Sequence, residues 1–92
     1  IFITENGIAT DNDDERIEFV TTVLKDLHKF VSENTNVIGY LYWSLLDNFE
    51  WDLGYQMNFG LVEVDKKTYE RIPHRSAKWF GKISSTNILS IT

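Results

Sequence analysis

This chain of 92 residues carries a net charge of −5 and has no cysteine. The acidic balance, without any basic stripe, disfavours nucleic acids and anionic membrane surfaces as partners, and no apolar stretch is long enough to span a bilayer. The lack of cysteine excludes disulfide bonds and is compatible with a cytoplasmic enzyme, the location we expect.

The first motif is a short strand that ends in a carboxylate. Residues 1–4 are apolar or β-forming, and the Asn-Gly pair at 6–7 predicts a sharp turn, so Glu5 is the last strand residue before the backbone reverses. A carboxylate there is held rigidly and faces open space. By itself the motif fits either a catalytic group or a solvated residue at the end of an edge strand.

A helix is predicted over residues 13–33, because apolar residues recur there by three and four. Its apolar face comprises Ile17, Val20, Leu24, Leu27 and Val31. The charged residues expected to face water are Arg16, Lys25, Asp26 and Lys29. We expect Asp11, Asp13 or Asp14 to cap this helix. The acidic run at 11–15 lacks the glycine and the terminal Glu spacing of a calcium loop, so we expect no metal there.

A second run of strand length begins at residue 40 and passes into an aromatic and acidic segment that includes Glu50. Strand, helix, strand is a βαβ unit, which predicts a parallel sheet. Each strand then delivers a Glu at or beyond its carboxyl end. From the residues alone, Glu5 and Glu50 could be read as the carboxylate pair of a glycosidase.

The rest of the chain predicts a hairpin and a helix. Residues 60–65 alternate as a strand, Lys66 and Lys67 make a polar turn, and 69–71 return antiparallel. Pro73 is expected to open a final helix that ends within 84–87. The aromatic residues expected to pack from helices against the sheet are Phe19, Phe30, Trp79 and Phe80.

Several ordered motifs together resemble the C-terminal part of family 1 glycoside hydrolases, the β-glucosidase and β-galactosidase group. They are Ile-Thr-Glu-Asn-Gly at 3–7, Tyr-Trp-Ser-Leu-Leu-Asp-Asn-Phe-Glu-Trp at 42–51, Gly-Tyr at 54–55, Phe-Gly-Leu-Val at 59–62 and Val-Asp at 64–65. The resemblance runs from residue 1 to about residue 83 and implies an α/β fold, a (β/α)₈ TIM barrel.

The resemblance also implies a retaining β-glycosidase in which Glu5 is the nucleophile. Glu50 would hold two hydroxyls of the non-reducing sugar, which argues against its being the second catalytic carboxylate. Trp43 and Trp51 would form the apolar wall of the sugar site. Phe59 would lie at its edge and Asn6 would help to orient Glu5. No metal or organic cofactor is implied.

The length predicts an incomplete barrel. A TIM barrel needs about 250 residues, so residues 1–92 would supply only its seventh and eighth strand-helix repeats within one domain. The acid/base Glu of the family lies upstream, in a Thr-Phe/Leu-Asn-Glu-Pro segment that these residues lack. We therefore expect an N-terminal barrel segment, in the same chain or a separate one, as a partner. Alone, the piece would expose strand edges and apolar helix faces.

Three further expectations follow from the resemblance. Relatives often have a cis peptide at the Trp-Ser step, which is Trp43-Ser44 here. Many carry Arg where this chain has Asn58, so a loop-supporting ion pair is expected to be missing. The carboxylate of Glu50 suits a neutral β-linked hexose and would repel a sugar phosphate. A non-catalytic sugar-binding relative and an inert structural fragment remain as alternatives.

Overall fold

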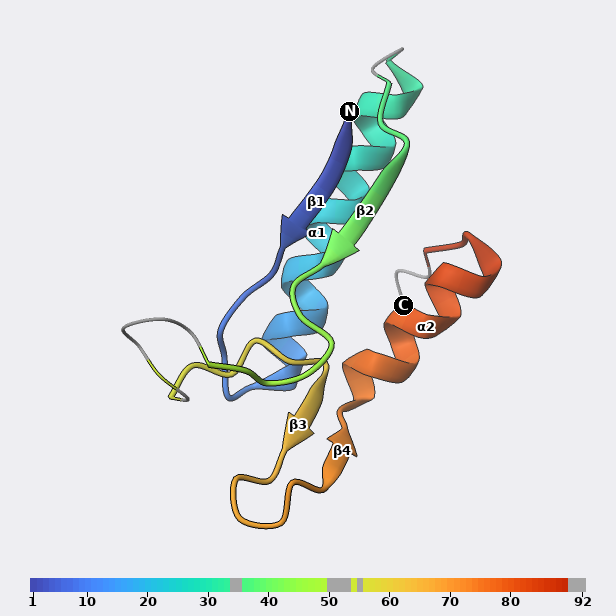
Figure 1. Cartoon of the computed structure of the whole chain (residues 1–92). Helices are drawn as coiled ribbons and strands as arrows, with labels where there is room; N and C mark the ends of the chain where they lie inside the picture. Colours follow the sequence, from blue (N-terminus) through green and yellow to red (C-terminus); the bar gives the residue numbers. More distant parts are fainter. Residues whose placement is uncertain (34–35, 50–53, 55, 90–92) are drawn as a thin grey trace.

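The computed structural model describes residues 1–33, 36–49, 54 and 56–89. Its elements follow the chain in the order strand, helix, strand, hairpin, helix (Figure 1). They are β1 (Phe2–Asn6), α1 (Asp13–Ser32), β2 (Gly39–Tyr42), β3 (Val62–Val64), β4 (Arg71–Pro73) and α2 (Arg75–Thr86).

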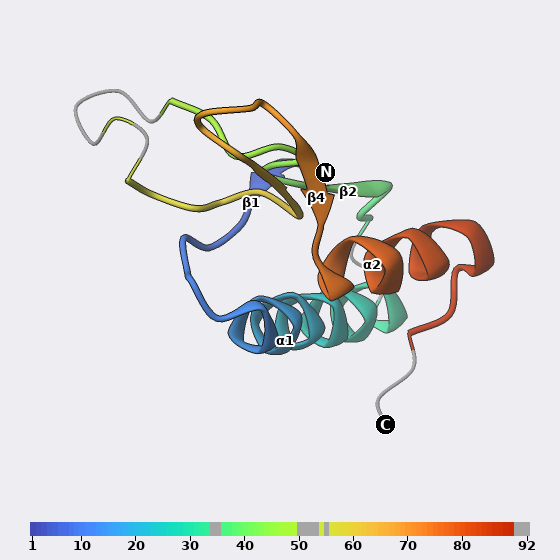
Figure 2. The same ribbon diagram turned by 90° about the horizontal axis from the view of Figure 1, so that it is seen from below.

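The predicted βαβ unit is confirmed. Strands β1 and β2 pair in parallel, and α1 connects them (Figure 1). Both helices lie on the same side of these strands (Figure 2). On that side the rings of Tyr40 and Tyr42 each lie 6.2 Å from the ring of Phe80, measured between centroids. Helices therefore cover one face of the two strands. Because the strands are parallel, the carboxyl ends of β1 and β2 lie at the same edge of the sheet.

The register of the two strands contains an irregularity within β1. Ile3 pairs with Tyr40, whereas the next pair joins Asn6 to Tyr42. Three steps along β1 thus oppose two along β2, which is the geometry of a β-bulge. The extra residue falls within Thr4–Glu5, immediately before Asn6 at the end of β1. The prediction that Glu5 is the last strand residue before a sharp turn was therefore wrong, because β1 extends to Asn6 and residues 7–10 follow without a described turn.

Helix α1 spans nearly the predicted range, but its cap and one of its faces differ from the prediction. The N-cap is Asn12, and not one of the three expected aspartates. Its side chain accepts a hydrogen bond from the backbone NH of Asp14 at 3.0 Å. Arg16, expected to face water, is only 1% exposed. Phe30 and Val31, expected to be packed, are about half exposed.

The predicted hairpin is confirmed, but the predicted start of the last helix was wrong. Strands β3 and β4 pair antiparallel, with Val62 opposite Pro73. Pro73 therefore lies in β4, and α2 begins two residues later at Arg75, after the N-cap His74. Helix α2 runs to Thr86 and ends at Asn87, which adopts the left-handed conformation common after a helix.

The hydrophobic core of the described residues is small. Val20 and Leu61 are its buried apolar side chains, while Phe2 on β1, Leu41 on β2 and Trp43 just after β2 are 40–50% exposed. An apolar surface of this kind in a soluble protein normally contacts further protein, as expected for part of a larger barrel. No helix within the described ranges has the length and hydropathy needed to cross a membrane.

Candidate active site

Glu5 lies where the bulge of β1 meets the carboxyl edge of the sheet. Thr4 and Glu5 are both exposed, whereas Ile3 and Asn6 on either side are partly buried. In a regular strand, neighbouring side chains point to opposite faces. The bulge breaks that alternation between Thr4 and Glu5, so these two neighbouring side chains are both accessible, whereas Ile3 and Asn6 turn toward the protein.

Trp43 is joined to the end of β1 by a backbone hydrogen bond. Its NH donates to the carbonyl oxygen of Asn6 at 2.8 Å, and its side chain is 40% exposed. The approach is so close that a Cβ atom on Gly7 would lie 1.9 Å from the carbonyl oxygen of Trp43. The Trp43-Ser44 peptide is cis, as predicted.

Phe59 is the third candidate residue at this edge. Its carbonyl oxygen accepts from the NH of Ser44 at 3.3 Å and from the hydroxyl of Tyr42 at 2.9 Å. The NH of Leu61 returns a bond to the carbonyl of Ser44 at 2.9 Å. Backbone hydrogen bonds thus link Asn6 to Trp43, and the residue after Trp43 to Phe59.

The side chain of Asn6 is hydrogen-bonded to a residue of β2. Its Oδ1 accepts from the hydroxyl of Tyr40 at 2.9 Å. Burial, and secondarily the neighbouring Tyr42, raise the pKa of Tyr40 to about 12, so this hydroxyl keeps its proton to a higher pH than an ordinary tyrosine and can donate it. A role for Asn6 in orienting Glu5 stays a prediction. Glu50 and Trp51, the other two predicted sugar contacts, lie outside the described residues.

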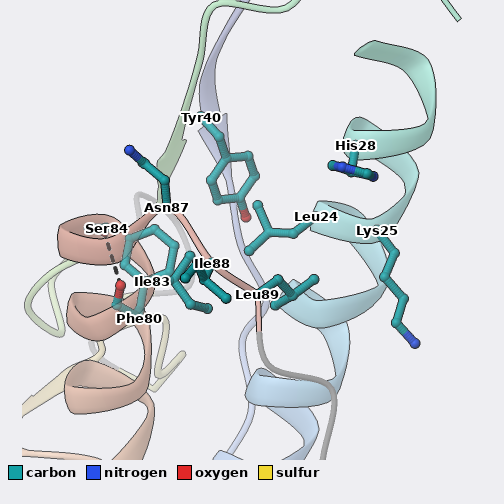
Figure 3. A pocket seen from close by; sticks show the side chains of 10 residues that line it. All are labelled: Leu24, Lys25, His28, Tyr40, Phe80, Ile83, Ser84, Asn87, Ile88 and Leu89. Carbon is teal, nitrogen blue, oxygen red and sulfur yellow. Dashed lines mark hydrogen bonds between the residues drawn. The ribbon is translucent and has the colours of Figure 1, made fainter. Parts of the chain in front are cut away.

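A cavity of about 630 Å³ lies away from this edge, on the helix side of the sheet (Figure 3). Leu24 of α1, Tyr40 of β2 and Phe80 of α2 line it together. None of Glu5, Asn6, Trp43 and Phe59 does. This cavity is therefore separate from the candidate site.

The sequence pattern missed a polar cluster beneath the site, centred on Arg16. The Nη1 atom of Arg16 donates to Asp13 Oδ1 at 2.8 Å. Asp13 also accepts from the backbone NH of Ser76 at 2.9 Å and from its hydroxyl at 2.6 Å. Ser76 is fully buried. The cluster thus fastens the start of α1 to the start of α2, and only residues distant in sequence reveal it.

Asn58, where many relatives carry Arg, still tethers its loop. Its Nδ2 donates to Asp11 Oδ1 at 2.5 Å. Its backbone carbonyl accepts from the NH of Thr10 at 3.1 Å. A neutral hydrogen-bonding side chain thus connects the 58–59 segment to the loop before α1, in place of an ion pair.

The Asp13 carboxyl makes stability depend on pH. Burial alone raises its pKa, but hydrogen bonds from Ser76 and Arg16 outweigh burial and hold the pKa below the ordinary 3.8. The unfolded chain then binds this proton more tightly, so the contribution of Asp13 is complete above the ordinary pKa and is lost as pH falls through the lower folded pKa. In a barrel that contains this chain, we expect Asp13→Asn to reduce the loss of unfolding free energy between about pH 5 and pH 3.

Urea denaturation at several pH values measures that slope. Asp26→Asn, at an exposed position of the same helix, is the matched control and should leave the slope unchanged. An identical pH dependence in native protein and Asp13→Asn would contradict the assignment.

Among the described residues, no group of three or more His, Cys, Asp or Glu side chains could hold a metal ion. Parallel strands backed by helices, with a carboxylate and aromatic residues at their carboxyl edge, are the arrangement of an active site in a (β/α) barrel enzyme. The local geometry therefore defines a parallel α/β segment, the kind of unit from which such a barrel is built.

Comparison with known proteins agrees with this class. The family model described as Glycosyl hydrolase family 1 matches residues 1–89. A protein of Oryza sativa subsp. japonica named "Putative beta-glucosidase 15" is 47% identical over 89 residues, covering 87% of this chain and 25% of that protein. The chain belongs to glycosyl hydrolase family 1.

Solved structures show the same relation. The β-glycosidase from Pyrococcus horikoshii matches 97% of this chain with a TM-score of 0.95 and 46% identity. The family 1 β-glucosidase from Thermotoga maritima matches 97% with a TM-score of 0.93 and 38% identity. The chain spans only 21% and 22% of these two proteins, so it corresponds to about a fifth of a TIM-barrel enzyme.

Proposed function

We propose that this chain is the catalytic C-terminal portion of a retaining β-glycosidase, similar to a β-glucosidase, that hydrolyses a terminal β-linked hexose. Residues 1–92 would form the seventh and eighth repeats of the barrel. The observation that carries the proposal is the position of Glu5, exposed on a bulge at the strand edge where Trp43 and Phe59 also lie. Active sites of this fold lie at that edge.

In the proposed reaction the Glu5 carboxylate bonds to the anomeric carbon while the bond to the leaving oxygen breaks. A Glu from the N-terminal barrel segment, about 5 Å away as retention requires, protonates that oxygen. It then takes a proton from water, which attacks the anomeric carbon and releases Glu5. Trp43, Phe59, Glu50, Trp51 and Asn6 would hold or border the sugar. The 92 residues alone would be inactive, because they lack the acid/base.

A covalent trap tests this function. A complete barrel containing residues 1–92 is incubated with an activated 2-deoxy-2-fluoro-β-glucoside, and the intact mass is measured. We expect one added fluorosugar, which peptide mapping places on Glu5. No adduct on a folded barrel would favour a non-catalytic sugar-binding relative, and an adduct on another carboxylate would overturn the role of Glu5.

A further inference from the structure

Three of the contacts of Arg16 point away from Asp13 and toward the loops of the candidate site. Its Nε donates to the hydroxyl oxygen of Tyr42 at 3.1 Å. Its Nη2 donates to two backbone carbonyls, that of Thr10 at 3.0 Å and that of Asn58 at 2.7 Å. One side chain of α1 thus contacts the end of β2, the loop after β1 and the residue before Phe59.

The chemistry of these groups gives the contacts a direction. An arginine side chain can only donate hydrogen bonds, so the hydroxyl of Tyr42 must accept from Arg16 and direct its own proton elsewhere. That proton goes to the carbonyl oxygen of Phe59, 2.9 Å away. The planar guanidinium fixes the angles between its donors. Arg16 therefore sets the position of Tyr42 and Asn58 together, and through them that of Phe59.

The same carbonyl of Phe59 also accepts from Ser44, the residue after Trp43. Any shift of this carbonyl would change the separation of the two aromatic residues that border the proposed sugar site. A buried arginine is not required for stability as such, since well-packed apolar residues often stabilise a site as well as a buried ion pair does. A requirement for several fixed donors explains its presence at 1% exposure.

We propose that Arg16 is a positioning residue for the sugar site, acting through the hydroxyl of Tyr42 and the backbone of Asn58 to place Phe59 relative to Trp43. The inference rests on the proposed function for the role of Phe59 as a sugar contact. The hydrogen-bond relay itself does not depend on it.

The test uses a complete barrel that carries residues 1–92, either the full natural polypeptide or a hybrid in which they replace the matched part of the Pyrococcus horikoshii β-glycosidase. Tyr42→Phe removes only the hydroxyl and keeps the ring beside Phe80. Arg16→Lys keeps the positive charge but removes the planar guanidinium with its several fixed donors. Arg75→Met is the matched control, because Arg75 is an exposed arginine on α2 whose partner is Asp14.

Two readouts are measured, the steady-state constants for an aryl β-glucoside and the hydrogen exchange of single amides. We expect Tyr42→Phe to raise KM about fivefold, the equivalent of one lost hydrogen bond, with kcat within about twofold of native. Exchange at the Ser44 amide should accelerate in Tyr42→Phe and Arg16→Lys, and at the Thr10 amide in Arg16→Lys alone. Arg75→Met should change neither readout.

Native KM and native Ser44 exchange in Tyr42→Phe, with only a lower melting temperature, would overturn the positioning role. If Arg16→Lys does not fold, the KM value and the Ser44 exchange of Tyr42→Phe decide whether the positioning role holds. A native barrel that folds but hydrolyses no β-glycoside would overturn the proposed function, whereas the exchange data would still support or refute the relay.

Discussion

Replacing Glu5 with Gln should lower kcat of the complete barrel by roughly 10³-fold or more, since a carboxamide is too poor a nucleophile to form the glycosyl-enzyme. The fold should be unaffected, because the side chain is exposed and Gln has almost the same shape. Steady-state turnover of an aryl β-glucoside, together with the melting temperature, measures both effects. The KM value should change far less than kcat, because Gln retains most contacts with the sugar.

The matched control is Glu63→Gln, which makes the same change at an exposed position of β3. It should leave kcat and KM unchanged. Normal turnover in Glu5→Gln would remove Glu5 from the role of nucleophile, and an equal loss in both variants would point to a nonspecific effect of charge.

Local sequence patterns predicted the βαβ unit and the place of Glu5 because both depend on neighbouring residues. The period of apolar residues identified α1, and the Asn-Gly pair indicated that β1 ends there, one residue later than predicted and without the predicted sharp turn. The hairpin was predicted from the alternation of apolar and polar residues at 60–65 and from the polar turn that follows. Its Asp65 side chain accepts from the backbone NH groups of Lys67 and Thr68, which stabilises that turn.

The features that the sequence did not reveal depend on pairing between distant residues. Arg16 has a polar side chain on a helix, so its pattern predicts exposure, yet its acceptors come from Tyr42 and Asn58, 26 and 42 positions away. The bulge in β1 exists only in relation to the register of β2. Neither can be read from a window of local sequence.

Pro73 shows how two local rules can compete. Proline suits the first turn of a helix, but it also suits an edge strand whose NH is not needed. Here it ends β4, and His74 donates its backbone NH to the carbonyl of Leu61 at 2.9 Å before α2 begins. The hairpin pairing therefore extends further toward α2 than the helix signal predicted.

Gly7→Ala should reduce both stability and activity, because the added Cβ would lie 1.9 Å from the carbonyl oxygen of Trp43. Backbone cannot rotate away as a side chain can, and Trp43 is also held by its own NH bond to Asn6. We expect a loss of about 3 kcal/mol of unfolding free energy, at the upper end of overpacking effects. Displacement of Trp43 should also lower kcat/KM. Denaturant unfolding and steady-state kinetics of the complete barrel measure these losses.

Gly81→Ala is the matched control, since a Cβ at this position of α2 meets no atom within 4 Å. Alanine is the better helix former, so this variant should gain about 0.5–1 kcal/mol and keep native kinetics. Opposite signs for the same added methyl group would show that close approach of the Gly7 backbone to Trp43, and not a general intolerance of glycine replacement, fixes the geometry around Glu5. If Gly7→Ala kept native stability and kcat/KM, the segment after Asn6 would have room to move, and the rigid placement of Trp43 beside it would be wrong.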